Sequence, residues 1–192
     1  MKLMIDLFSG LGGASEAFTQ GPSPWAVLRY ENNPLLADVA YTQICDLRTF
    51  NIHVRHDIDL IWASPPCTDF SMGFNAPGPT AKREGRDFEP SLELVKRAIT
   101  IIEELKPSTW IIENVVGSIK HLEPILGPPR QIIGPFVLWG NFPLIICSTD
   151  DFESKTNFTP SLMRPNLRAK IPLELSVAVR RALEDQKTLK SW

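Results

Sequence analysis

The chain has 192 residues, of which 43% are hydrophobic and 22% are charged, and its formal net charge is −2. This composition indicates a globular domain, and the sequence shows neither a signal peptide nor a run of about 18 apolar residues that could span a membrane. The three cysteines, Cys45, Cys67 and Cys147, are odd in number and lack C-x-x-C spacing, which argues against a disulfide framework and a zinc site. We therefore expect a cytoplasmic protein without a bound metal.

Short apolar runs alternate along the chain with segments of helical pattern. Strands are predicted at residues 3–8, 25–30, 60–63, 110–112 and 144–147, and helices at residues 14–19, 34–41, 90–105 and 171–183. Residues 70–90 lack an apolar rhythm and are predicted to be a long loop. The alternation predicts an α/β fold, a Rossmann-like doubly wound and mostly parallel sheet, with residues 1–192 forming one domain. Ligands of such sheets bind at the carboxyl ends of the strands.

A glycine-rich turn, Ser-Gly-Leu-Gly-Gly at residues 9–13, follows the first predicted strand and precedes a helix. Glycines in such a turn let backbone N–H groups approach a ligand at the helix N-terminus, although many plain turns share the pattern. Glu31 closes the second strand, and Asp46 follows a further strand candidate. In this architecture the two acids could lie near a ribose and an adenine, or they could merely cap a helix or face solvent.

A proline-stiffened turn carrying Cys67 follows the predicted strand at residues 60–63. A cysteine displayed in such a turn is a candidate nucleophile, whereas an isolated cysteine is more often an inert core residue. The next predicted strand delivers Glu113 to the same edge of the sheet, so that a carboxyl group could lie beside the thiol. Taken alone, a glutamate at position 113 is more often a structural or solvated acid.

Together these segments resemble the DNA cytosine-5 methyltransferase family. The stretch from Asp6 to Gly13 is similar to its first cofactor motif, Pro65-Pro66-Cys67 with Phe70-Ser71 to its nucleophile motif, and Glu113-Asn114-Val115 to its catalytic glutamate motif. Residues 168–172, Arg-Ala-Lys-Ile-Pro, are similar in position to its last motif but lack the usual Gly-Asn core. The resemblance covers residues 1–115 well and the final thirty residues loosely.

The resemblance implies that S-adenosylmethionine is the cofactor, that S-adenosylhomocysteine is the product and that Cys67 and Glu113 are catalytic. Cys67 would add to C6 of cytosine, and Glu113 would hold a proton against N3, so that C5 could accept the methyl group. The residues expected to contact the cofactor are Asp6, Phe8, Ser9, Gly10, Leu11, Gly12, Gly13, Glu31, Asn32, Asp46, Leu47, Pro66 and Lys170.

DNA is the substrate that the resemblance implies, with the target base flipped out of the duplex and the loop after Cys67 closing over it. The expected substrate contacts are Ser71, Lys82, Arg83, Arg86, Asn114, Arg130 and Arg168. The cations of the loop could instead serve only to keep an exposed segment solvated.

Two departures from the family bear on recognition of the substrate. The usual pair of arginines near the cytosine is represented only by Arg130. About 25 residues separate the turn at residues 139–142 from Arg168, too few for a target-recognition domain. Specificity would then come from the loop after Cys67, from a partner chain, or from residues 155–192, a basic segment and helix expected to pack back on the cofactor region. Trp139 and Phe142 could stack on a base or lie in the core.

We therefore expect a DNA (cytosine-5-)-methyltransferase, in the cytoplasm of a bacterium or a phage-infected cell. Two alternatives stay open: the same chemistry on RNA or a free cytosine nucleotide, and a weakly active regulatory subunit that needs a partner. The presence of both Cys67 and Glu113 disfavours the regulatory subunit, because plain binding requires neither side chain.

Overall fold

A mixed sheet forms the centre of the computed structural model, which describes residues 1–20, 24–150, 152 and 162–189. Its seven strands lie in the order β3-β2-β1-β4-β5-β7-β6, and β7 runs in the direction opposite to the other six. The strands are β1 (Lys2–Leu7), β2 (Trp25–Glu31), β3 (Thr42–Ile44), β4 (Leu60–Ala63), β5 (Thr109–Val115), β6 (Gln131–Ile133) and β7 (Phe136–Gly140). This arrangement confirms the predicted Rossmann-like, mostly parallel α/β class.

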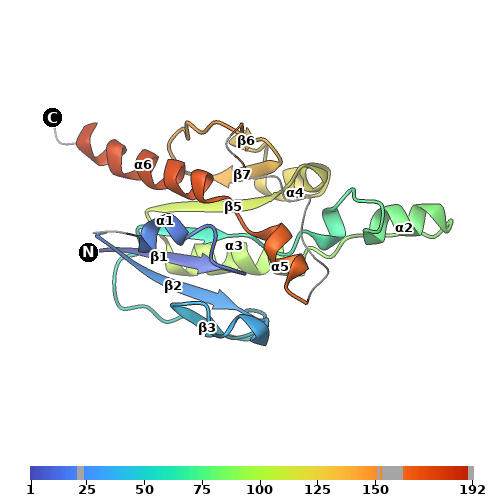
Figure 1. Ribbon diagram of the computed structural model, residues 1–192, viewed down its shortest axis with the longest axis horizontal. Helices are drawn as coiled ribbons and strands as arrows, with labels where there is room; N and C mark the ends of the chain where they lie inside the picture. The colour runs from blue at the N-terminus through green and yellow to red at the C-terminus, as the bar shows by residue number, and fades with distance from the viewer. Residues whose placement is uncertain (21–23, 151, 153–161, 190–192) are drawn as a thin grey trace.

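Helices cover both faces of the sheet and extend past the carboxyl ends of its strands. In Figure 1, α2 and α5 lie at the end of the molecule toward which the arrows of β1 and β2 point. The helices are α1 (Glu16–Thr19), α2 (Pro77–Arg83), α3 (Glu93–Leu105), α4 (Ile119–Leu126), α5 (Arg164–Ala169) and α6 (Leu173–Leu189), and the 3-10 helices are η1 (Pro34–Leu36), η2 (Thr68–Phe70) and η3 (Val116–Ser118).

Alternation along the strands divides the core into two layers. Leu3, Ile5 and Leu7 of β1 pack in one cluster with Val95 and other residues of α3. Met4 belongs to a second cluster, on the face that α1 and α6 cover. Because both faces of the central strands are buried, these strands are apolar almost throughout, as parallel strands are in doubly wound folds.

The predicted helix at residues 34–41 is wrong beyond its first turn. Only the 3-10 helix η1 forms there, and the Asn33 side chain caps it by accepting a hydrogen bond from the Leu35 N–H at 3.1 Å. Tyr41 then adopts a positive φ of 64°, which ends any helical path. Leu36 is buried, whereas Leu35 and Tyr41 are exposed, so the segment offers no apolar stripe that a helix could bury.

The predicted strand at residues 144–147 is also wrong. Ile145 is buried between the exposed Leu144 and Ile146, which imitates strand alternation. Its backbone pairs instead with the Gln131 side-chain amide, which donates to Ile145 O at 2.6 Å and accepts from Ile145 N at 3.0 Å. The strands at this edge are β6 and β7, which form a hairpin around Gly134 and Pro135.

The long loop predicted at residues 70–90 contains the helix α2. Prolines occupy the first turn of α2, where a missing N–H breaks no helical hydrogen bond. Pro77-Gly78-Pro79 therefore starts a helix, although the same residues are typical of a loop. We call residues 71–90 the α2 arm; only Ala81 and Pro90 of this arm are buried.

The C-terminal helix α6 packs against α1. The Ser176 hydroxyl donates to Ala14 O at 2.7 Å and accepts from Ala17 N at 3.1 Å, and the Arg180 guanidinium donates to Ala17 O. Of the basic segment predicted at residues 155–192, residues 155–161 and 190–192 lie outside the described part of the chain. The described part thus joins its last helix to the helix that follows the glycine-rich turn.

Among the described residues, no helix is long and apolar enough to cross a membrane. Within the same residues, no group of three or more His, Cys, Asp or Glu side chains is arranged to hold a metal ion.

Candidate active site

A cavity of about 500 Å³ lies where the strand order reverses. β1 pairs with β2 on one side and with β4 on the other, so the connections that leave β1 and β4 diverge at their carboxyl ends. A crevice forms at such a switch point, and ligands of open α/β sheets bind there. The predicted site residues that line this cavity are Asp6, Phe8, Ser9, Gly10, Leu11, Gly13, Pro66, Cys67, Glu113, Arg168 and Lys170.

The glycine-rich turn is shaped by close contacts from behind. A Cβ atom at Gly12 would overlap the guanidinium of Arg29, and one at Gly13 would overlap the backbone of Ile171. Phe8, at the start of the turn, adopts a positive φ of 58°, a strained conformation for a bulky residue. The sequence pattern predicted that the glycines of this turn let a ligand approach. In the structure, Gly12 and Gly13 instead leave room for Arg29 and for the segment before α6.

Asp6, Ser15 and Arg29 form a buried polar network beneath this turn. The Ser15 hydroxyl donates to Asp6 Oδ2 at 2.5 Å, and Arg29 Nε donates to Ser15 Oγ at 2.7 Å. The guanidinium of Arg29 also donates to Ala40 O at 2.8 Å. Burial raises the pKa of Asp6 to about 6, even though its hydrogen bond with Ser15 and the charge of Arg29 act to lower it.

Two buried polar atoms on the wall of the cavity have no hydrogen-bond partner. They are Asp6 Oδ1 and Ser9 Oγ, and both residues line the cavity. Because an unpaired buried polar atom costs free energy, such atoms indicate positions where a ligand supplies the missing partner. A polar ligand in this cavity would fit both.

Glu31 and Asp46 do not line the cavity, and neither do Asn32 and Leu47. The Glu31 carboxylate accepts hydrogen bonds from Gly10 N at 2.8 Å, Asn32 N at 3.0 Å and Asn33 N at 2.9 Å. A carboxylate offers about four lone-pair sites, so one more donor can be accommodated. Glu31 thereby connects the end of β2 to the glycine-rich turn.

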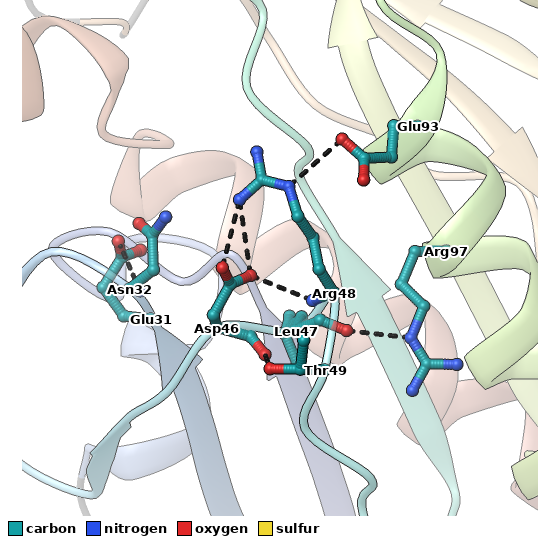
Figure 2. A network of polar contacts seen from close by, with 8 residues as sticks. All are labelled: Glu31, Asn32, Asp46, Leu47, Arg48, Thr49, Glu93 and Arg97. Atoms are coloured by element: carbon teal, nitrogen blue, oxygen red, sulfur yellow. Dashed lines mark hydrogen bonds and ion pairs between the residues drawn. The ribbon is translucent and has the colours of Figure 1, made fainter.

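Asp46 lies after β3 in a network with α3. Its carboxylate pairs with Arg48 at 3.3 Å, and Arg48 also reaches Glu93, at the start of α3, at 3.1 Å (Figure 2). The Arg97 guanidinium of the same helix donates to Leu47 O at 2.8 Å. The backbone hydrogen bond from Arg48 lowers the pKa of Asp46. The residues after β3 are therefore fastened to α3.

Cys67 lies in the connection that follows β4, and Glu113 lies near the end of β5, the strand that pairs with β4. Ala63 of β4 lies opposite Ile112 of β5, so the residues that follow reach the same edge of the sheet. Glu113 is buried, Cys67 is half-buried, and both line the cavity. The chain thus brings a thiol and a carboxyl group into one cavity with the glycine-rich turn.

Asn114 holds the connection after β4 against the end of β5. It is almost fully buried; its Nδ2 donates to Pro65 O at 3.0 Å, and its Oδ1 accepts from Val115 N at 2.9 Å. Pro65 lies two residues before Cys67, and Asn114 follows Glu113. The Asn114 side chain, predicted as a substrate contact, thus joins the turn that carries the thiol to the strand that carries the carboxyl group.

Five of the other predicted substrate contacts lie away from this cavity. Ser71, Lys82, Arg83 and Arg86 line a second cavity beside the α2 arm. Arg83 lies 3.9 Å from the centre of the Phe74 ring, and Arg86 pairs with Glu84. Arg130 lines neither cavity and donates to Phe142 O. Trp139 and Phe142 are 1% and 2% exposed, which places both of them in the core.

Arg168 and Lys170 border the cavity from the segment before α6. Lys170 Nζ forms an ion pair with Glu16 Oε2 of α1 at 2.7 Å. The same segment meets Gly13 through Ile171. The last described segments therefore close the cavity on the side of the glycine-rich turn.

Sequence reasoning missed Ser15 and Arg29. A signal existed for Arg29, because a single arginine inside the apolar strand β2 must find buried acceptors. Nothing in the sequence singles out Ser15, because a serine at the start of a helix is usually a cap.

The chain is similar to proteins of a known family. The family model described as C-5 cytosine-specific DNA methylase matches residues 3–124. The probable DNA (cytosine-5)-methyltransferase of Frog virus 3 is 32% identical over 117 residues, which cover 58% of this chain and 52% of that protein. The type II methyltransferase M.AquIA of Picosynechococcus sp. is 29% identical over 151 residues, which cover 69% of this chain and 58% of that protein.

A solved structure supports the fold. The Entamoeba histolytica methyltransferase EhMeth superimposes with a TM-score of 0.50 at 14% sequence identity, covering 84% of this chain and 61% of that chain. This likeness concerns the fold alone. The chain spans between one half and three fifths of the length of the two curated relatives described above.

Proposed function

This chain belongs to the C-5 cytosine-specific DNA methylase family, and on that premise we propose that it transfers the methyl group of S-adenosylmethionine to C5 of cytosine in DNA. The observation that carries this proposal is that Cys67, Glu113 and the glycine-rich turn line one cavity. A thiol nucleophile, a carboxyl group and a cofactor cradle are the three parts that this chemistry needs at one place. S-adenosylhomocysteine would be the second product.

The cofactor would occupy the side of the cavity formed by the glycine-rich turn. A volume of about 500 Å³ is within the range of small-molecule sites. The unpaired Asp6 Oδ1 and Ser9 Oγ would take part in hydrogen bonds with its polar groups, and the remaining lone-pair site of Glu31 would receive a hydroxyl. Phe8, Leu11, Pro66 and Lys170 would complete the wall, while Asn32, Asp46 and Leu47 would act at the rim. When bound, the sulfonium supplies an electrophilic methyl group.

Cys67 would begin the reaction on the substrate. Its thiolate adds to C6 of the cytosine ring, which places electron density on C5. Glu113 holds a proton at N3 and accepts a hydrogen bond from the exocyclic amine, thereby offsetting the charge on the ring. After C5 has gained the methyl group, loss of the C5 proton returns the electron pair to the ring and expels Cys67. Asn114 would keep the thiol in register with Glu113 throughout.

Duplex DNA would have to present its cytosine as a flipped base, because stacking covers both faces of the ring. Lys82, Arg83 and Arg86 of the α2 arm would then contact phosphates beside the cavity, and Ser71, Arg130 and Arg168 would contact DNA from other sides. We infer that a partner chain supplies most of the sequence recognition. The short spacing between Phe142 and Arg168 supports this inference.

We also infer a cytoplasmic location in a bacterium or an infected cell. None of Cys45, Cys67 and Cys147 is part of a disulfide. Cysteines in the thiol state suit a reducing compartment.

Methyl transfer from labelled S-adenosylmethionine to four substrates tests the proposal. Duplex DNA, single-stranded DNA, RNA and dCMP are incubated separately with the protein, and the modified base is identified by mass spectrometry. We expect 5-methylcytosine in DNA. Transfer only to dCMP or only to RNA would contradict the DNA substrate, and transfer to none would favour a subunit that needs a partner.

Cysteine variants test the nucleophile. Cys67→Ala should abolish transfer while cofactor affinity, measured by calorimetry, stays within about twofold, because the thiol acts on the base. Cys147→Ala is the matched control, since Cys147 lines neither cavity, and it should retain transfer. Activity that survives in Cys67→Ala would show that the nucleophile is misassigned.

A further inference from the structure

A second cavity, of about 1040 Å³, lies between the α2 arm and α4. One wall is formed by residues of the α2 arm, among them Met72, Lys82 and Phe88. The opposite wall is formed by η3 and α4, among them Val116 and Lys120. Figure 1 shows α2 extending beyond the sheet on the side where η2 and α4 lie. We call this cavity the arm groove.

The arm groove begins where the first cavity ends. Cys67 lines the first cavity and Asp69, two residues later, lines the groove. On the other wall, Val115 lines the first cavity and Val116 lines the groove. Both segments therefore continue from the first cavity, which holds the reacting thiol, into the groove. A molecule that reaches past Cys67 would enter it.

The groove combines exposed apolar side chains with cations. Met72 is 78% exposed and Phe88 is 38% exposed. Lys82 and Lys120 are exposed on opposite walls. Among the acids of the groove, Asp69 is already engaged by the Ser91 N–H at 3.1 Å. Apolar surfaces on which a base can stack, flanked by cations that meet phosphate, are the features of single-strand nucleic acid sites.

His121 adds a second flat surface inside the groove. Its ring centre lies 5.8 Å from that of Phe70. Burial, together with the neighbouring charge of Lys120, lowers the pKa of His121, so that the ring is neutral at pH 7. His121 therefore offers a stacking surface, and the lysines supply the positive charge.

We propose that the arm groove binds the nucleotide that adjoins the target cytosine in a DNA strand. This proposal rests on the proposed function, and it makes the preferred substrate a polynucleotide rather than a free nucleotide. The adjoining base would stack against Phe88 or Met72, and Lys82 and Lys120 would contact the phosphates on its two sides. The groove would thereby hold the part of the strand that lies next to the flipped base.

Binding of fluorescein-labelled oligodeoxynucleotides, followed by anisotropy at several salt concentrations, tests the groove independently of methyl transfer. We expect a six-nucleotide strand containing one cytosine to bind at least about tenfold more tightly than labelled dCMP. Lys82→Ala combined with Lys120→Ala should weaken the strand about tenfold and reduce the salt slope by about two, or about one per lost phosphate contact. Affinity for labelled deoxycytidine, which carries no phosphate, should not change.

Lys96→Ala is the matched control, because Lys96 is exposed on α3 and lines neither cavity. It should leave affinity and salt slope unchanged. Thermal melts check that every variant is folded. Equal affinity for the strand and dCMP, or a double variant that binds the strand like the wild type, would contradict the proposal that the groove binds a nucleotide.

The two proposals fail in different ways. Strand binding that depends on the two lysines, without methyl transfer to any substrate, would support the groove proposal and contradict the proposed function. Methyl transfer to DNA, with strand binding unaltered in the double variant, would support the proposed function and contradict the groove proposal.

Discussion

The glycine-rich turn and the α2 arm flank the same cysteine but are built differently. The turn is packed from behind by Arg29 and Ile171, and a buried polar network lies beneath it. In the arm only Ala81 and Pro90 are buried, and its cations lie at the surface. Contacts at the level of the backbone thus fix the region assigned to the cofactor, whereas exposed side chains form the region assigned to the polymer.

This difference matches what each region has to do. Methyl transfer requires reacting atoms held in a narrow geometry, which rigid packing provides. Phosphate contacts tolerate longer and softer side chains, because their energy depends mainly on charge. We therefore expect substitutions in the turn to act on stability and rate, and substitutions in the arm to act on substrate affinity.

Gly13→Ala should have the largest effect on stability. The added methyl group would overlap the backbone of Ile171, which cannot move aside as a flexible side chain could. We expect a loss of at least about 3 kcal/mol in the free energy of unfolding, measured with urea. Gly73→Ala in the arm is the control, because its methyl group would meet only Ser71 Oγ at 3.4 Å. Equal losses in the two variants would remove the contrast between the regions.

Asp6→Asn should change how stability depends on pH. The pKa of Asp6 is raised from 3.8 to about 6, so the folded protein holds a proton that the unfolded chain loses between these values. The cost of burying the charge therefore grows as pH rises and is complete above about pH 6. Relative to the wild type, Asp6→Asn should gain up to about 3 kcal/mol between pH 4 and pH 7.

Urea unfolding across this pH range provides the measurement. Asp38→Asn serves as the control, because Asp38 is exposed. If the difference in the free energy of unfolding between Asp6→Asn and the wild type stayed constant with pH, folding would not raise the pKa of Asp6.

Asn114→Ala should lower kcat about 10- to 100-fold with little change in KM, because loss of the bond to Pro65 O displaces Cys67 from Glu113. Asn141→Ala is a matched control at the other end of β5, where the side chain also makes two hydrogen bonds, to Trp110 N and Ser108 O. It should stay within about twofold of the wild type in kcat. Alkylation of Cys67 by iodoacetamide gives a second readout, and its rate should change only in Asn114→Ala. Equal effects on both readouts would reduce Asn114 to a purely structural residue.

Lys170→Ala should have the smallest effect on stability. Its ion pair with Glu16 is partly exposed, with 35% and 28% of the two side chains accessible. Solvent screens such a pair, so we expect a loss of no more than about 1 kcal/mol in the free energy of unfolding. A double-mutant cycle with Glu16→Gln measures the pair directly. A coupling well above that value would mean that this contact, rather than the Gly13 packing, fastens the segment before α6.

Local sequence patterns predicted the central strands and the residues at their ends. β1, β2, β4 and β5 are apolar runs followed by distinctive turns, so the cavity around Cys67 and Glu113 could be located from them. The helix α3 was also predicted; Ala98 and Ile101 are buried on it, and Ile99 and Leu105 pack partly buried against the same cluster.

The failures arise where a tertiary contact replaces a local signal. The Gln131 side chain satisfies the backbone of Ile145, so alternation at residues 144–147 produces no strand. Pro77 and Pro79 start α2, although the same residues also favour a loop. Asp6, Ser15 and Arg29 meet only in the folded chain. Ser15 precedes α1 and Arg29 lies in β2, and the two side chains come together with Asp6 beneath the glycine-rich turn.

The central claim is that Cys67 attacks C6 of a cytosine in DNA. A duplex that carries 5-fluorocytosine tests it directly, because fluorine at C5 cannot leave as a proton does and the Cys67 adduct therefore persists after methyl transfer. We predict that the wild-type protein, with S-adenosylmethionine, forms a complex that survives denaturing electrophoresis, and that peptide mass spectrometry finds the nucleotide on Cys67. An adduct on another residue, or a complex formed equally by Cys67→Ala, would contradict the account.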